Sequence, residues 1–167
     1  MAIQNAKDLF VHELGDLYDA EQRILEMLPQ LANESSDGQA KSAFQHHEQQ
    51  TRQQVKNLEQ CFKMLGTQPK HTSCQAIAGL KQEHDNFVKE SPSKEILTMF
   101  DLGGAAKTTH YEIASYQGLI EKATLMGMKD CAKLLQENLG QEEEMAQKVT
   151  QISKQLCKQM FQAAPRA

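Results

Sequence analysis

Tryptophan is absent from the 167-residue sequence, and aromatic residues make up only 5% of it. Eight methionines and a hydrophobic share of 40% accompany this scarcity. The balance is more typical of packed helices than of β-sandwiches or barrels. Because 167 residues is the size of one domain and enough to close a hydrophobic core, we expect a single domain spanning residues 1–167.

Blocks of lysine and arginine are also absent, and the formal net charge at pH 7 is −4. This charge argues against a dedicated nucleic-acid surface and against an anchor for anionic membranes. No apolar run is long enough to span a bilayer, and the chain does not open with a charged segment followed by an apolar one. We therefore expect a cytoplasmic protein whose partners include neither nucleic acid nor a membrane.

Motifs for disulfide frameworks and for common catalytic sites are missing. The four cysteines form no CxxC pair, so they are interpreted as reduced thiols that fill small spaces in a core. No GxSxG elbow, phosphate-binding loop or catalytic Cys-His pattern is present. Conventional hydrolase or kinase chemistry is therefore unsupported.

Four long segments carry hydrophobic residues at helical spacing. They cover about residues 5–32, 38–66, 92–126 and 128–160. Short connections join the first segment to the second and the third to the fourth, whereas a long connection over 67–93 joins the two pairs and has a short helical pattern of its own. This connectivity predicts an all-α, ferritin-like four-helix bundle with a long crossover that carries a short extra helix.

Proline and glycine mark the ends of these segments. Gly66 and Gly127 follow the second and third helices, where glycine commonly ends a helix. Pro29 falls in the last turn of the first helix, and we expect it to bend or fray that turn. Residues 161–167 have nothing to pack against, so we expect this tail to fray.

Glutamates occupy positions in these helices that otherwise carry core residues. The seam of the first segment is spaced alternately four and three residues apart, as in a helix packed nearly parallel to its neighbours. It consists of Phe10, Leu14, Leu17, Glu21, Ile24 and Leu28. Glu112 and Glu142 hold equivalent positions in the third and fourth segments. Three of the four helices therefore direct a carboxylate towards the interior of the bundle.

Counting from the turns places these carboxylates at one depth. Glu112 lies 15 residues before Gly127, and Glu142 lies 15 residues after it. In the first hairpin, Glu21 and Thr51 lie at similar distances from the connection between their helices. Two antiparallel helices bring residues that are equidistant from their turn to the same level. We therefore expect the three carboxylates to converge.

A histidine reaches the same level from the second helix. His47 lies one turn before Thr51, a displacement of roughly 6 Å along the helix axis. Three ionised carboxylates cannot share a dry core unaided, because each loses hydration and repels the others. Carboxylates with one imidazole suit iron or manganese, and bundles build two-metal sites in this way. Gln50, three residues after His47, can complete the ligand shell with its carbonyl oxygen.

The sequence resembles a known family in five blocks that cover most of the chain in order. These blocks are ELGDLYDAEQRI, AFQHHEQQTRQQVKNLEQCF, CQAIAGL, HYEIASYQGLI and LLQENLGQEEE. They resemble the successive blocks of the YciF/YciE-like stress proteins of bacteria. The resemblance implies a ferritin-like fold, a homodimer and a dinuclear metal site in the bundle. Glu21, His47, Glu112 and Glu142 match family positions.

One block departs from the family pattern. Where relatives commonly read HLEET, this sequence reads HEQQT from His47 to Thr51, so an amide at Gln50 replaces the expected carboxylate. The Glu-x-x-His spacing of ferritins is also missing, because Met145 stands three residues after Glu142. We therefore expect one of the two metal positions to be weakened.

Two functions remain open at this stage. The first is a metal-dependent stress protein that binds one or two iron or manganese ions through Glu21, His47, Glu112, Glu142 and Gln50 and reacts with oxygen or peroxide. The second is a non-catalytic helical dimer that serves as a binding or scaffolding module with a degenerate metal site. An iron-storage shell or a DNA-protecting dodecamer is disfavoured by the lack of a basic tail. The scattered histidines His12, His71 and His84 are interpreted as structural or exposed.

Overall fold

The structure is a computed structural model, and it describes residues 3–69 and 72–163. Over these residues the chain forms helices and connections but no strand. The helices are α1 (Ala6–Glu34), α2 (Gly38–Met64), α3 (Gln75–Lys89), α4 (Lys94–Leu125) and α5 (Lys129–Ala163). The elements agree in number and order with those predicted from the sequence.

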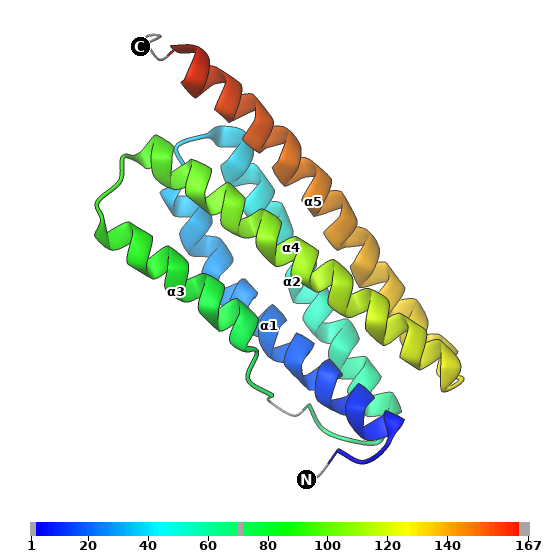
Figure 1. The fold of residues 1–167 in the computed structure, drawn as a ribbon. Coiled ribbons are helices and arrows are strands. Elements are labelled where there is room, and N and C mark those ends of the chain that lie inside the picture. The colour runs from blue at the N-terminus through cyan, green and yellow to red at the C-terminus, as the bar shows by residue number, and fades with distance from the viewer. Residues whose placement is uncertain (1–2, 70–71, 164–167) are drawn as a thin grey trace.

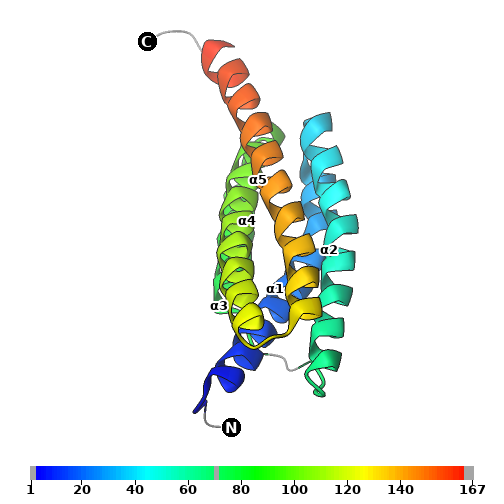
Figure 2. The same cartoon turned by 90° about the vertical axis from the view of Figure 1, so that its right-hand side faces the viewer.

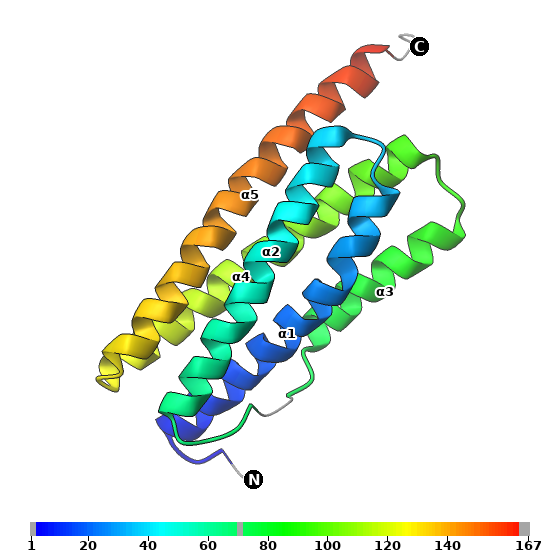
Figure 3. The same cartoon turned by 180° about the vertical axis from the view of Figure 1, so that it is seen from behind.

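The four long helices α1, α2, α4 and α5 form an antiparallel bundle (Figure 1). The hairpins α1/α2 and α4/α5 pack side by side, with α1 against α4 and α2 against α5. The side and rear views show the same arrangement (Figures 2 and 3). The short helix α3 lies outside the bundle and packs along α1 and α4. This architecture confirms the predicted ferritin-like bundle with a helix in its crossover.

Local sequence signals set where the helices begin and end. Asn5, Asp37 and Ser93 precede α1, α2 and α4, and each side chain accepts a hydrogen bond from a backbone N–H in the first turn. After α2 and α4, Gly66 and Gly127 have φ angles of 70° and 73°. These left-handed values favour glycine and let the chain leave the helix.

Two predicted helix ends differ from the structure. α1 continues through Pro29 to Glu34, because Leu31 and Ala32 are buried and hold the last turn on the bundle. α5 continues to Ala163, so residues 161–163 are helical where fraying was expected. Hydrogen bonds within the helix sustain this end although Phe161 is 79% exposed. Residues 164–167 of the predicted frayed tail lie outside the described residues.

A polar layer interrupts the hydrophobic core of the bundle. The largest fully buried apolar side chains include Phe10, Leu14, Leu17, Phe44, Leu58, Phe62, Leu102, Leu119 and Leu135. Between them, every long helix also buries polar side chains that are 0–2% exposed: Glu21, His47, Thr51, Gln54, Thr109, Glu112, Asn138 and Glu142. A bundle of this size does not need so many buried polar groups for stability, which points to a function for the layer.

The state of the cysteines and the apolar character of the helices were both expected from composition. Cys61, Cys74 and Cys131 are buried free thiols, as predicted, and Cys157 is half-buried. Within residues 3–69 and 72–163, no helix combines the length and the apolar character needed to cross a membrane.

Candidate metal centre

Three side chains from three helices meet in the polar layer. His47 of α2, Glu112 of α4 and Glu142 of α5 each offer one ligand atom, and these atoms all lie within 4.8 Å of one another. The three residues are at most 2% exposed. The structure therefore brings together three of the five residues that the sequence predicted as ligands.

Glu21 of α1 lies beside this group. It is fully buried, and its carboxyl interacts with those of Glu112 and Glu142. The hydroxyl of Tyr116 donates a hydrogen bond to Glu21 Oε1. Glu21 thus faces the same interior space from the remaining side of the bundle, as the sequence predicted.

Burial governs the ionisation of these carboxyls. Loss of hydration, followed by repulsion from the Glu142 charge, raises the pKa of Glu112 well above its usual range. The same two causes raise the pKa of Glu21. Burial is the largest single influence on Glu142 and acts to raise its pKa, but the charge of His47 and hydrogen bonds with His47, Glu112 and Gln54 together leave this pKa lowered. The centre is therefore short of positive charge around Glu21 and Glu112.

Glu142 is oriented by two nitrogen atoms from α2. His47 Nε2 lies 3.1 Å from Glu142 Oε1, and Gln54 Nε2 donates a hydrogen bond of 2.6 Å to the same oxygen. The other oxygen, Oε2, is buried and has no hydrogen-bond partner in the described part of the chain. Sequence analysis missed Gln54, although its position seven residues after His47 places both on one face of α2.

Several acceptor atoms in this layer are buried without a donor among residues 3–69 and 72–163. They are both carboxylate oxygens of Glu112, Oε2 of Glu21, Oε2 of Glu142 and Oγ1 of Thr51. Leaving a buried acceptor unsatisfied costs about 1–3 kcal/mol, and more for a charged group. A cation between the carboxylates would satisfy these oxygens together. The carboxylates of Glu112 and Glu142 and the imidazole of His47 are therefore groups that could hold a metal ion.

Gln50, the amide at the position where the sequence resemblance led us to expect a carboxylate, is less buried than the other candidates. Gln50 is half-buried, and its Oε1 is buried without a donor among the described residues. No described contact joins Gln50 to His47, Glu112 or Glu142, so its role as a ligand stays a prediction. Met145 is 2% exposed and fills the interior where a ferritin pattern would place a histidine.

A chain of hydrogen bonds supports Glu21 from the other helices. Asn57 Nδ2 donates to Asn138 Oδ1 at 2.7 Å, and Asn138 Nδ2 donates to the Tyr116 hydroxyl at 3.0 Å. The Tyr116 hydroxyl donates in turn to Glu21. This chain, which we call the Asn57–Glu21 ladder, connects α2, α5, α4 and α1. The sequence prediction did not include Asn57.

Four antiparallel helices, a crossover helix and a buried cluster of carboxylates with a histidine define a ferritin-like helical bundle protein with groups that can hold a metal ion. The chain belongs to the family described as "Domain of unknown function (DUF892)", which matches residues 5–162.

A related sequence and two solved structures support the same assignment. Protein YciF of Escherichia coli (strain K12) is 30% identical over 154 residues, which are 92% of this chain and 93% of the relative. The crystal structure of the E. coli stress protein YciF matches with a TM-score of 0.88 at 29% identity, covering 93% of this chain and 99% of that one. The YcfI structure from Rhodopseudomonas palustris matches with a TM-score of 0.85 at 34% identity, covering 89% and 94%. The resemblance to YciF-like proteins is thereby confirmed.

Proposed function

We propose that this protein is a stress-response protein that holds iron or manganese in its bundle, with His47, Glu112 and Glu142 as ligands. One observation carries the proposal: Glu112 is fully buried, and neither of its carboxylate oxygens has a hydrogen-bond donor among the described residues. The carboxyls of Glu142 and Glu21 raise its pKa rather than stabilise its charge, and the neighbouring imidazole of His47 is paired with Glu142. A cation is the partner that this environment lacks.

A second metal position lies between Glu112 and Glu21 in this proposal. The carboxyl of Glu112 interacts with those of both Glu21 and Glu142, so Glu21 and Glu112 would be the carboxylates that hold a second ion. Gln50 offers this second ion a neutral oxygen in place of a carboxylate. We therefore expect the second ion to bind more weakly than the first.

The residues around the centre orient a carboxylate for metal binding and limit the access of water. Gln54 holds Oε1 of Glu142, which leaves Oε2 without a donor in the described structure and available to a cation. Met145 and Ile24 are buried beside this layer and restrict access of bulk water. Bound iron or manganese would supply redox chemistry towards oxygen or peroxide. The protein's own contribution is to bind the ions, orient their ligands and exclude water.

The metal content of the protein tests this proposal directly. Protein purified without chelator, then reconstituted anaerobically with ferrous or manganous ions, is expected to retain one ion tightly and a second weakly, as measured by elemental analysis and titration calorimetry. His47→Ala should lose the tight ion, whereas His46→Ala, which alters an exposed neighbour on α2, should retain it. Less than about a tenth of an equivalent of metal before and after reconstitution would contradict the proposal. Peroxide consumption by the loaded wild type, absent from His47→Ala, tests the redox part.

The Tyr116→Phe variant tests the support of Glu21 by the Asn57–Glu21 ladder. It removes the hydroxyl that donates to Glu21 and accepts from Asn138. Because outer partners orient metal ligands, we expect Mn²⁺ affinity to fall by about 10–100-fold in titration calorimetry. Tyr111→Phe is the matched control, since Tyr111 lies on the same helix but donates to Asp16. Equal affinities in Tyr116→Phe and the wild type would show that the ladder does not support the centre.

The Asn57–Glu21 ladder also favours a second candidate function. It crosses all four long helices through protein groups alone, so it can fix helix pairing in a non-catalytic scaffolding dimer. Such a protein would show no metal-dependent stability. For either function we propose a homodimer, and light scattering of the purified protein would measure its mass.

A further inference from the structure

A second cluster of metal-ligating side chains lies outside the bundle centre. Glu34 at the end of α1, His84 of α3 and Asp101 of α4 each place one ligand atom within 4.8 Å of the others. His84 Nε2 lies 2.9 Å from Glu34 Oε2 and 3.5 Å from Asp101 Oδ1. Three different elements therefore converge on one point where the crossover helix meets the bundle.

Asp101 is the buried carboxylate of this cluster that lacks hydrogen-bond donors in the described structure. It is 2% exposed, and neither of its carboxylate oxygens has a hydrogen-bond partner among residues 3–69 and 72–163. Burial raises its pKa to about 7, against the attraction of His84 and together with the repulsion of Glu34. A carboxylate this deeply buried is normally held by several donors. Asp101 instead directs two unsatisfied oxygens towards a histidine and a second carboxylate.

A clamp that only fastens α3 to the bundle does not explain this arrangement. The contact between His84 and Glu34 would suffice for that purpose, and Glu34 Oε1 already accepts a hydrogen bond from Gln30. Lys81 of α3 is paired with Asp85 and not with Asp101: its Nζ lies 2.6 Å from Asp85 Oδ2. The imidazole of His84 faces a third carboxylate as well, since Asp85 Oδ1 lies 3.4 Å from His84 Nδ1. One imidazole among three carboxylates leaves the cluster short of positive charge. An imidazole and two carboxylates are the donor set of open divalent metal sites.

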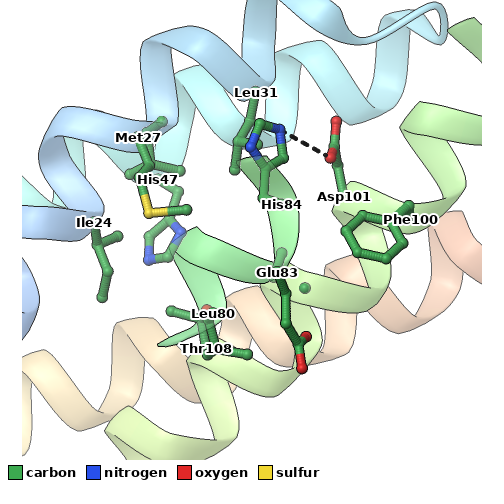
Figure 4. A pocket seen from close by; sticks show the side chains of 13 residues that line it. Ile24, Met27, Leu31, His47, Leu80, Glu83, His84, Phe100, Asp101 and Thr108 are labelled. Atoms are coloured by element: carbon green, nitrogen blue, oxygen red, sulfur yellow. Dashed lines mark ion pairs between the residues drawn. The ribbon is translucent and has the colours of Figure 1, made fainter. Parts of the chain in front are cut away.

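A cavity lies between this cluster and His47 of the bundle centre, since residues of both line it. Its volume is about 40 Å³, which is enough for at least one water molecule, and both His84 and His47 line it (Figure 4). Asp101 lines it as well, and the exposed Glu83 lies at its rim. The remaining wall is mostly apolar and comes from Ile24, Met27, Leu28, Leu31, Leu80 and Phe100. The cavity thus has polar groups towards α3 and a ligand of the centre in its lining.

We propose that Glu34, His84 and Asp101 form a second binding site for a divalent transition-metal ion, separate from the bundle centre. The ion there replaces the missing donors of Asp101 and is held by groups from α1, α3 and α4. Because the same cavity is lined by His47, this site also delivers the ion to the centre. Binding at the second site stands on its own, whereas delivery rests on the proposed function.

The binding claim is tested in protein whose central site has been disabled. In a Glu112→Leu background, with Glu112→Gln as a second background, about one equivalent of divalent metal is expected to bind. Absorption spectroscopy measures this for Co²⁺, and titration calorimetry measures it for Zn²⁺. Adding Asp101→Asn or His84→Ala should weaken this binding at least about tenfold. Adding His12→Ala, an exposed histidine of α1, should leave it unchanged.

The outcomes separate the second site from the centre. If the Glu112 variants bind no metal while the wild type binds one or two ions, the second site is wrong and the proposed function stands. If the Glu112 variants bind metal as the wild type does, and Asp101→Asn removes it, the second site is right and the central ligands are wrong. Binding that survives both Asp101→Asn and His84→Ala overturns the second site.

The delivery claim is tested by kinetics in the otherwise wild-type protein. Stopped-flow measurement of Fe²⁺ loading at the centre is expected to be about tenfold slower in Asp101→Asn than in the wild type, because a negative group in a cavity raises the local cation concentration. The affinity of the centre at equilibrium should be unchanged. Equal loading rates in the two proteins overturn delivery by this route.

Discussion

Replacing Glu112 with leucine is expected to abolish metal binding at the bundle centre and to raise the melting temperature of the metal-free protein. Leucine fills a similar volume and removes a fully buried carboxyl whose oxygens lack donors in the described structure. Exchanging buried ionic groups for well-packed apolar ones can stabilise a protein by about 1–4 kcal/mol. In a domain of this size, each kcal/mol corresponds to about 2–4 °C.

Scanning calorimetry with and without chelator measures both effects in one experiment. The wild type should melt higher with Mn²⁺ than with chelator, and Glu112→Leu should melt higher than the wild type when both are in chelator. The double variant Glu112→Leu/Asp101→Asn, which disables both proposed sites, should melt at one temperature with and without Mn²⁺. Glu121→Leu is the matched control because Glu121 is an exposed glutamate on the same helix. A wild type whose melting temperature does not respond to any metal would favour the scaffolding function instead.

Replacing Asn138 with alanine is expected to lower the free energy of unfolding by about 2–4 kcal/mol, the largest loss among the polar variants. Asn138 is fully buried, accepts from Asn57, and donates to the Tyr116 hydroxyl and to the backbone carbonyl of Gln54. Alanine leaves the Asn57 amide without its acceptor and opens a space between α2, α4 and α5.

Urea denaturation of the metal-free protein measures this loss. Gln136→Ala is the control, since it removes an exposed amide from the same helix and should change stability by no more than about 0.5 kcal/mol. If Asn138→Ala is no less stable than this control, the Asn57–Glu21 ladder contributes nothing to packing.

The fold and the central cluster were predictable because both depend on local spacing. The alternation of four and three residues that places Glu21 in the seam of α1 also decides which face of the helix is buried. Glu112 and Glu142 were placed at one depth by counting from Gly127, whose left-handed conformation makes a tight turn. Such a turn keeps two helices in register, so equal distances along the chain become equal depths.

The amides and the second cluster could not be predicted in the same way. Only the rotation of α2 within the bundle decides that Gln54 and Asn57 are buried. The cluster of Glu34, His84 and Asp101 depends on where α3 crosses α1 and α4. A long crossover leaves that position open at the level of sequence, so His84 had only a general interpretation as structural or exposed.

The placement of α3 outside the bundle has a consequence for how the interior is reached. α3 buries only Ile77 and His84, whereas each of α1, α2 and α4 buries ten or more residues. Segments with few buried contacts open locally at a smaller free-energy cost than the whole protein unfolds. We therefore expect α3 to open at a smaller free-energy cost than the four long helices, and such opening would expose the cavity lined by His84 and His47 to solvent.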